Sequence, residues 1–325
     1  MKNVIIHLFL FVTVCICSLE TYSQIPVINT VKVEVNPDIV SPIPNFIFKK
    51  NHLGNENIGA YIGQEIITLP ISDQLQEYGY HNIISYKELK IDELKEHFYS
   101  IFSPRNHIKY DSIVNKTLII DSIKKIDYEN YVFYIHDKNE PIKKYMYCYD
   151  TKYSWTLNDE YLIGGYYNYL KSFIGNSYKI IDNDIIHDKD IENGKGIIFP
   201  VNKIWKVINV GLIDRKLCLT LSNNNQTTYI VAERFSEYIY DYNKPNKSRI
   251  FNINDWNAMV KRYGTTYMQC VKESAIKVGM PAKLVILSWG KPDEINRSSY
   301  GDEQWVYGDQ YVYINPQTKK CTAWN

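Results

Sequence analysis

The last fifty residues constrain the fold of this chain most strongly, because helix boundaries and strand-forming runs follow one another there with only short turns between them. Gly279 opens a short apolar segment, and Gly290 and Pro292 are residues that end helices. Runs rich in aromatic and β-branched residues follow at 303–307, 310–314 and 320–324, with Gly308-Asp309 between the first two. Residues 264–325 are therefore predicted to form a helix packed on a three-stranded antiparallel sheet.

This pattern resembles the BamE family of outer-membrane lipoproteins, also called SmpA or OmlA. The matching positions are Gly279, Met280, Val285, Gly290, Pro292, Gln304, Trp305, Tyr307, Tyr311, Tyr313 and Trp324. The resemblance covers about a fifth of the chain and implies an accessory module for membrane-protein assembly. Pro281 departs from it, because the family has a serine or threonine there, and the family's lipid-bearing cysteine is missing.

The resemblance also implies a contact surface, because aromatic side chains dominate protein interfaces. The candidate contact residues are Trp289, Asn296, Trp305, Tyr307, Tyr311 and Tyr313. Alternation along a strand does not say which face is exposed. Either Trp305 or its neighbours along the strand must build the core of the module, and both assignments stay open.

The N-terminus has the pattern of a secretory signal. Lys2 precedes an apolar run of about fourteen residues, which is short for a membrane span of roughly 20. Ser23 supplies a small residue before a cleavage site, and neither Cys15 nor Cys17 follows the small residue that lipidation requires. We expect residues 1–23 to be removed, which leaves an exported protein without a lipid or a transmembrane segment, in the periplasm, at the cell surface or secreted.

Four cysteines follow the signal, and an even number in an exported chain permits two disulfides. Cys270 and Cys321 lie at opposite ends of the terminal module, where a bridge would join helix to sheet. Buried free thiols are the alternative. Cys148 and Cys218 lie in strand-like runs and form the second candidate pair.

The charge balance argues against some partners. The chain has 37 basic and 36 acidic residues, so no field recruits nucleic acid or an anionic membrane. Its 29 tyrosines are too many for a core to satisfy every hydroxyl. Exposed tyrosines favour contact with sugars or proteins, although compositional drift explains the number equally well.

Two stretches of the chain share an order of landmarks. Tyr61-Ile62-Gly63-Gln64 recurs as Phe173-Ile174-Gly175-Asn176. Three predicted strands and a helix-like stretch follow each: 118–120, 131–135, 144–149 and 160–171 in the first copy, and 205–208, 217–221, 228–232 and 256–263 in the second. The pattern predicts tandem duplication of a small β-domain, and a strongly bent barrel of the Src-homology-three type suits so few strands.

The predicted fold is thus α+β, with two β-rich domains before the BamE-like module. The expected divisions are 1–23 for the signal, 24–60 for an N-terminal strand and linker, 61–171 and 172–263 for the repeats, and 264–325 for the module. A helix is also expected within residues 85–102, where Leu89, Leu94 and Phe98 recur at helical spacing.

Signatures of catalysis are weak. Cys148 with His187 is the one candidate nucleophile and base, but Cys148 lies in a predicted strand with nothing to lower its pKa. The acid-rich loop at 182–194 lacks the glycine and glutamate positions of a calcium hand, so we interpret it as a solvated hairpin. We expect no cofactor and no bound metal.

We therefore expect an exported, non-enzymatic envelope protein whose module contacts an envelope protein or a cell-wall polymer. Two alternatives stay open. One is an inhibitor built on a helix-plus-sheet unit similar to that of the β-lactamase inhibitor protein. The other is ligand or cell-wall binding by the β-domains.

Overall fold

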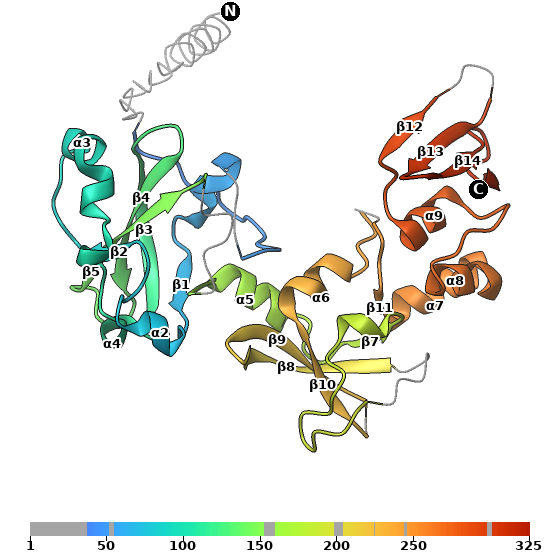
Figure 1. Ribbon diagram of the computed structural model, residues 1–325, viewed down its shortest axis with the longest axis horizontal. Coiled ribbons are helices and arrows are strands. Elements are labelled where there is room, and N and C mark those ends of the chain that lie inside the picture. The colour runs from blue at the N-terminus through green and yellow to red at the C-terminus, as the bar shows by residue number, and fades with distance from the viewer. Residues whose placement is uncertain are drawn as a thin grey trace, which may run out of the picture. The chain divides into compact units, whose positions relative to one another are not determined.

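The computed structural model describes residues 38–51, 55–152, 160–197, 204–223, 225–243, 246–297 and 301–325. The predicted signal at 1–23 and the first part of the N-terminal strand and linker expected at 24–60 lie outside these residues. The chain divides into two units, Met1–Pro37 and Asp38–Asn325. The second unit holds three antiparallel sheets (Figure 1), which confirms the predicted α+β class.

The first sheet has the strand order β2-β5-β4-β3-β1-β6. Its strands are β1 (Glu65–Thr68), β2 (Ile83–Ser85), β3 (Thr117–Lys125), β4 (Asn130–Asp137), β5 (Lys144–Asp150) and β6 (Tyr161–Ile163). The helical segments around it are η1 (Asn55–Tyr61), α2 (Asp73–Gln76), α3 (Ile91–Ile101), η2 (Pro104–Asn106), α4 (Tyr110–Ile113) and α5 (Gly164–Lys171).

Helix α3 covers one face of this sheet (Figure 1). Its buried Leu94 and Phe98 form a cluster with Val132 of β4 and Met146 of β5. The residues that alternate with these along the strands, such as Phe133, point into the main core on the opposite face. Both faces of β4 and β5 are therefore buried, which explains their almost unbroken apolar character.

The second sheet has the strand order β10-β9-β8-β7-β11. Its strands are β7 (Ser177–Ile180), β8 (Ile204–Ile213), β9 (Lys216–Ser222), β10 (Thr227–Val231) and β11 (Ile250–Asn252). The helical segments are η3 (Asn183–Ile185), α6 (Ala232–Tyr238) and α7 (Ile253–Tyr263). One continuous hydrophobic core joins the first and second sheets.

The two sheets repeat one topology, because β5-β4-β3-β1-β6 has the same order as β10-β9-β8-β7-β11. Gly63 precedes β1 and Gly175 precedes β7, with φ angles of 80° and 88°. Each of these glycines donates its N–H to the next long strand, to Ile120 O and Val207 O respectively, both at 2.8 Å. Only glycine adopts such a φ without strain, so the shared sequence landmark marks a shared turn.

The long strands β3 and β8 also match residue by residue. Each has a register shift against its neighbour directly after this hydrogen-bonded residue, between Ile120 and Ser122 in β3 and between Val207 and Asn209 in β8. Their core-facing residues are Leu118, Ile120 and Ile123 in β3, and Trp205, Val207 and Val210 in β8. The spacing of buried positions around the bulge is therefore identical in the two sheets.

Two predicted helices begin later than expected. Residues 160–171 were expected to be helical throughout, but Tyr161–Ile163 form β6, which pairs with β1 before α5 begins. These three residues are apolar and buried, so pairing with the sheet overrides their helical context. The helix expected within 85–102 starts only at Ile91, because Ile83–Ser85 pair with β5.

The third sheet lies at the C-terminus with the order β12-β13-β14-β15. Its strands are β12 (Glu294–Asn296), β13 (Glu303–Tyr307), β14 (Gln310–Ile314) and β15 (Cys321–Trp324), and helices α8 (Thr265–Lys272) and α9 (Ala282–Trp289) precede it. The sheet has four strands where three were predicted, because the three-residue β12 pairs with β13. Its core also includes Phe251, Trp256 and Met259, so it begins before the predicted boundary at residue 264.

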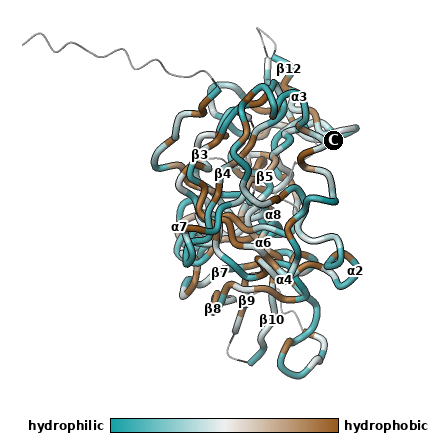
Figure 2. Tube along the Cα trace, turned by 90° about the vertical axis from the view of Figure 1, so that its left-hand side faces the viewer, coloured by the Kyte–Doolittle hydropathy of each residue, from teal (hydrophilic) through white to brown (hydrophobic). Residues whose placement is uncertain are grey.

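Hydrophobic positions are spread along the strands and helices of the second unit (Figure 2). Among the residues that the structure describes, no helix is long and apolar enough to cross a membrane.

Candidate contact face of the C-terminal sheet

Helix α9 and the sheet are joined by a short set of backbone contacts. Gly279 has a φ of 84° and donates its N–H to Cys321 O at 2.7 Å, and Cys321 N–H donates to Met280 O at 2.8 Å. Gly290, with a φ of 98°, ends the helix by donating to Ile286 O. Gly290 therefore ends α9, and Gly279 joins the segment just before the helix to β15.

One face of the sheet packs on the helices. Trp305 is only 6% exposed and pairs in register with Val312, which pairs in turn with Trp324. The indole Nε1 of Trp305 donates to Glu303 Oε2 at 3.2 Å. Trp305 is thus a core residue and not a contact residue. The alternation along the strand had left open which of these two roles it has.

Trp289 and Tyr307 belong to the same inner side. Their rings meet edge to face with centroids 5.4 Å apart. Tyr307 OH donates to Gly290 O at 3.0 Å and Trp289 Nε1 donates to Ser274 O at 2.7 Å. Burial raises the pKa of Tyr307 well above that of a free phenol. Both side chains hold α9 on the sheet, so their predicted role in partner contact is not supported.

The remaining three candidates lie on the opposite, outer face. Asn296, Gln304, Tyr313 and Ala323 pair in register across all four strands. Asn296 Nδ2 donates to Gln304 Oε1 at 3.2 Å, and Gln304 Nε2 donates to Tyr313 OH at 3.1 Å. Tyr311 lies in the next row, opposite Val306. We call Asn296, Gln304, Tyr311 and Tyr313 the outer-face residues.

Gln304 is the outer-face residue that sequence reasoning missed as a candidate. The hairpin around Gly308-Asp309 pairs Tyr307 with Gln310, and counting outward from that pair puts Gln304 opposite Tyr313. The predicted turn was therefore sufficient to deduce that Gln304 lies opposite Tyr313. Asn296 could not be placed in the same way, because residues 297–302 separate it from β13, and a connection of that length leaves the strand register open.

The proposed bridge between Cys270 and Cys321 is not formed. All four cysteines at positions 148, 218, 270 and 321 are free thiols. Cys321 is buried with its Sγ 3.5 Å from Ala323 O, whereas Cys270 is half-buried on α8. The backbone bonds at Gly279 and the contact of Trp289 with Tyr307 join helix to sheet instead. Burial raises the pKa of Cys321, and that of Cys218 to about 11.

The candidate nucleophile and base are not brought together. Cys148 is buried in the cluster under α3, where burial raises the pKa of its thiol. His187 instead stacks on Tyr229 of β10, with ring centroids 4.5 Å apart. A thiol in this environment is a packing residue.

The acid-rich loop forms a hairpin only in its second half, after η3, and it is not solvated throughout, because Asp190 is buried. Lys189 and Gly196 form an antiparallel bridge. The Asp190 carboxylate accepts hydrogen bonds from the N–H groups of Glu192, Asn193 and Thr227. These bonds lower the pKa of Asp190 and tie the loop to β10.

Comparison with known proteins adds no relative. No protein-family model matches the chain, and neither a curated protein nor a solved structure is similar to it.

Proposed function

We propose that this chain is an exported, non-enzymatic protein of the cell envelope, and that the outer face of its C-terminal sheet binds another envelope protein. The helix and sheet have the order expected of a BamE-like module, which supports this assignment. We further propose that the first two sheets are small barrels of the Src-homology-three type, because in each the last strand returns to lie beside the first.

The observation that carries the proposal is the row formed by Asn296, Gln304 and Tyr313. The Asn296 and Gln304 amides and the Tyr313 hydroxyl are held by one another at 3.1–3.2 Å. Side chains fixed in this way lose little conformational freedom when a partner binds. The row is uncharged, so it suits a hydrogen-bonding protein surface better than a strongly charged polymer.

The proposal is tested by photo-cross-linking in the native envelope. A photoreactive amino acid placed at Tyr313 should give a discrete protein adduct. The same photoreactive residue at Tyr128, a tyrosine in the turn between β3 and β4 that is 80% exposed, is the control and should give no adduct. Cross-linking only to cell-wall polymer, or equal adducts from both positions, would contradict the proposal.

Substitution gives a second readout. Gln304→Ala with Tyr313→Ala should weaken capture of that adduct's partner at least tenfold, because central interface residues carry most of the binding energy. The thermal midpoint should stay within a few degrees of the wild-type value, since neither side chain belongs to the core. A large fall in the midpoint would mean that the row has a structural role.

A further inference from the structure

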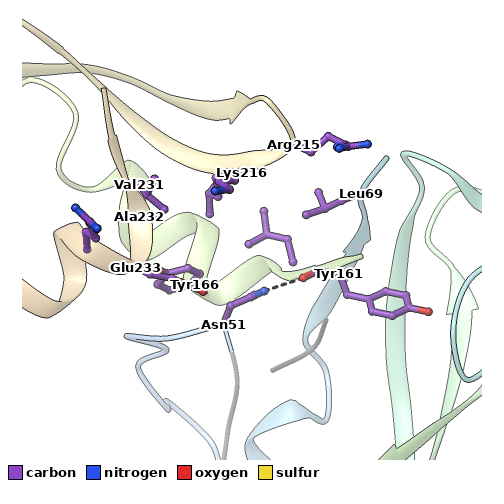
Figure 3. Close-up of a pocket in the computed structure, with 12 residues that line it drawn as sticks. Asn51, Leu69, Tyr161, Tyr166, Arg215, Lys216, Val231, Ala232 and Glu233 are labelled. Carbon is purple, nitrogen blue, oxygen red and sulfur yellow. Dashed lines mark hydrogen bonds between the residues drawn. The ribbon is translucent and has the colours of Figure 1, made fainter. Parts of the chain in front are cut away.

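A cleft of about 350 Å³ opens where the first and second sheets meet (Figure 3). This volume is at the lower end of the range for small-molecule sites, roughly 300–1,000 Å³. Its apolar wall includes the buried Leu69, Leu162 and Ala232 and the half-buried Leu217. The wall therefore offers an apolar body a place out of water.

The walls of the cleft are held by specific contacts. Asn51 Nδ2 donates to Tyr161 O at 2.7 Å and Asn51 Oδ1 accepts from Ile163 N–H at 2.9 Å, so this side chain takes up the free edge of β6. Tyr166 OH and Ser236 Oγ lie 3.2 Å apart and join α5 to α6. The two sheets also share one core. A site with such walls is formed before a ligand arrives.

The mouth of the cleft is rich in positive charge. Arg215 lies in the turn between β8 and β9 and Lys216 is the first residue of β9, and Figure 3 shows both on this hairpin among the lining residues. Asp214 and Arg215 have φ angles of 48° and 65°, a left-handed conformation that is strained for residues other than glycine. The turn thus places an arginine where glycine would be less strained. Neither Arg215 nor Lys216 has an ion pair within the described part of the chain.

The other charged lining residues differ from this pair. Arg234 donates to Asp184 O at 2.8 Å. Glu233 is the one carboxylate among the lining residues that are described, and its charge raises the pKa of Tyr166 after the larger effect of burial. Glu233 therefore lies near α5, whereas Arg215 and Lys216 lie on the hairpin.

We propose that this cleft binds a small organic anion, with the negative group paired to Arg215 and Lys216 and an apolar body packed on Leu162 and Leu217. An inorganic anion would leave the apolar wall unused, and a neutral apolar molecule would leave the two cations unused. The proposal does not depend on the C-terminal face. No basic run in the sequence announced this site, because its charges come from the hairpin at 215–216 and from residue 234.

The test compares two probes on the full chain. 8-Anilinonaphthalene-1-sulfonate has an apolar body and one sulfonate, and N-phenyl-1-naphthylamine is the same body without the sulfonate. The anionic probe should bind at one site and at least threefold more tightly than the neutral one, and its affinity should fall with salt. Equal affinities for the two probes would overturn the proposal.

Variants assign the binding to this cleft. Arg215→Gln and Lys216→Gln should each weaken the anionic probe about two- to fivefold, as expected for exposed ion pairs. Glu233→Gln should strengthen it, because a repulsive charge is removed. Lys206→Gln removes an exposed cation of the same sheet outside the cleft and should have no effect. Equal weakening by Lys206→Gln, or unchanged binding in the Arg215 and Lys216 variants, would show that the probe binds elsewhere.

Competition then identifies the ligand source. Octanoate represents an acyl anion, and N-acetyl-leucyl-leucine represents the carboxyl end of a peptide. Displacement of the bound probe by either supports the proposal and names the source. If neither competitor displaces the bound probe, even in large molar excess over the probe, the assigned ligand class would be refuted.

Discussion

The first and second sheets share strand order, bulge position and glycine turn, but they use their outer surfaces differently. In the first sheet, α3 covers β4 and β5 and forms a second core. In the second sheet, β8 exposes Ile204, Ile208 and Leu212. The equivalent positions in β3 are Thr117, Asp121 and Lys125, so apolar residues stand where the first sheet has polar ones. The common topology thus depends on the inner positions, and the outer positions are free to diverge.

The edges of the two sheets differ as well. Arg249 directly precedes β11 and is 2% exposed. Its guanidinium donates to Ser288 O at 2.9 Å and to Ser274 Oγ at 2.6 Å, and it lies within 3.5 Å of Val271 O and Leu287 O. These carbonyls lie at the ends of α8 and α9, where a cation is favoured. The equivalent residue before β6 is Glu160, which accepts from His81 N–H.

The largest predicted effect comes from this difference. Arg249→Met should lower the free energy of unfolding by about 3 kcal/mol, because several buried carbonyls lose their donor. Urea denaturation followed by tryptophan fluorescence measures it. Glu160→Gln should cost far less, since an amide oxygen still accepts from His81 N–H. Equal losses would mean that Arg249 does not anchor the C-terminal helices.

The glycine turns test whether the two sheets are equivalent. A Cβ at Gly63 or Gly175 meets nothing within 4 Å, so alanine there adds only backbone strain. Gly63→Ala and Gly175→Ala should each cost about 1 kcal/mol, and the two values should agree. Hydrogen exchange of the amides in β3 and β8 gives the local free energies. A cost at only one site would break the correspondence.

The equivalent strands β4 and β9 end differently, because only the end of β4 has a residue that titrates. Asp137 of β4 has a side chain that is 2% exposed and accepts from Lys116 Nζ at 2.7 Å, and Asn223 follows β9 at the matching position. Burial alone would raise the pKa of Asp137, but the bond from Lys116 and the N–H of Asn139 outweigh it and lower that pKa. The ionised carboxylate therefore stabilises the fold above the unfolded pKa of about 4.

Asp137→Asn should consequently lower stability by about 1 kcal/mol at neutral pH. The deficit should be constant above about pH 5 and should shrink as the pH falls through the lowered pKa of Asp137 in the wild-type protein. Denaturation midpoints of both proteins between about pH 2 and 7 measure it. A deficit that grows in acid would contradict the assigned direction.

The sequence predicted those features that depend on residues close together in the chain, and it missed those that depend on residues far apart. The hairpin at Gly308-Asp309 fixed β13 and β14 to the residue, and the two glycine landmarks marked the repeated turns. Six strands, β1, β2, β6, β7, β11 and β12, escaped prediction, because each has only three or four residues and is defined by its sheet neighbours. The sequence could not assign the six contact candidates to the inner or outer face. That assignment depends on the pairing of β14 with β15 and on the side of the sheet on which α9 packs. The cleft could not be foreseen, because Leu69, Leu162 and Arg215 meet only through the packing of the two sheets.

The smallest predicted effect concerns the bulge residue itself. Asp121 bulges out of β3 with its carboxylate 2.8 Å from His136 Nδ1, and Ile208 bulges out of β8 with 45% of its surface exposed. Ile208→Asp should change stability by less than about 0.5 kcal/mol, because the same backbone site already carries aspartate in the first sheet.

Ser222 matches His136 in register, so Ile208→Asp with Ser222→His should rebuild the pair. A double-mutant cycle at about pH 5.5, where a free imidazole is mostly protonated, should show a coupling of about 0.2–1 kcal/mol. If Ile208→Asp alone were strongly destabilising, the exposed apolar residues of β8 would pack against another part of the fold. The two outer surfaces would then differ because they have different packing partners, and not because their residues are free to vary.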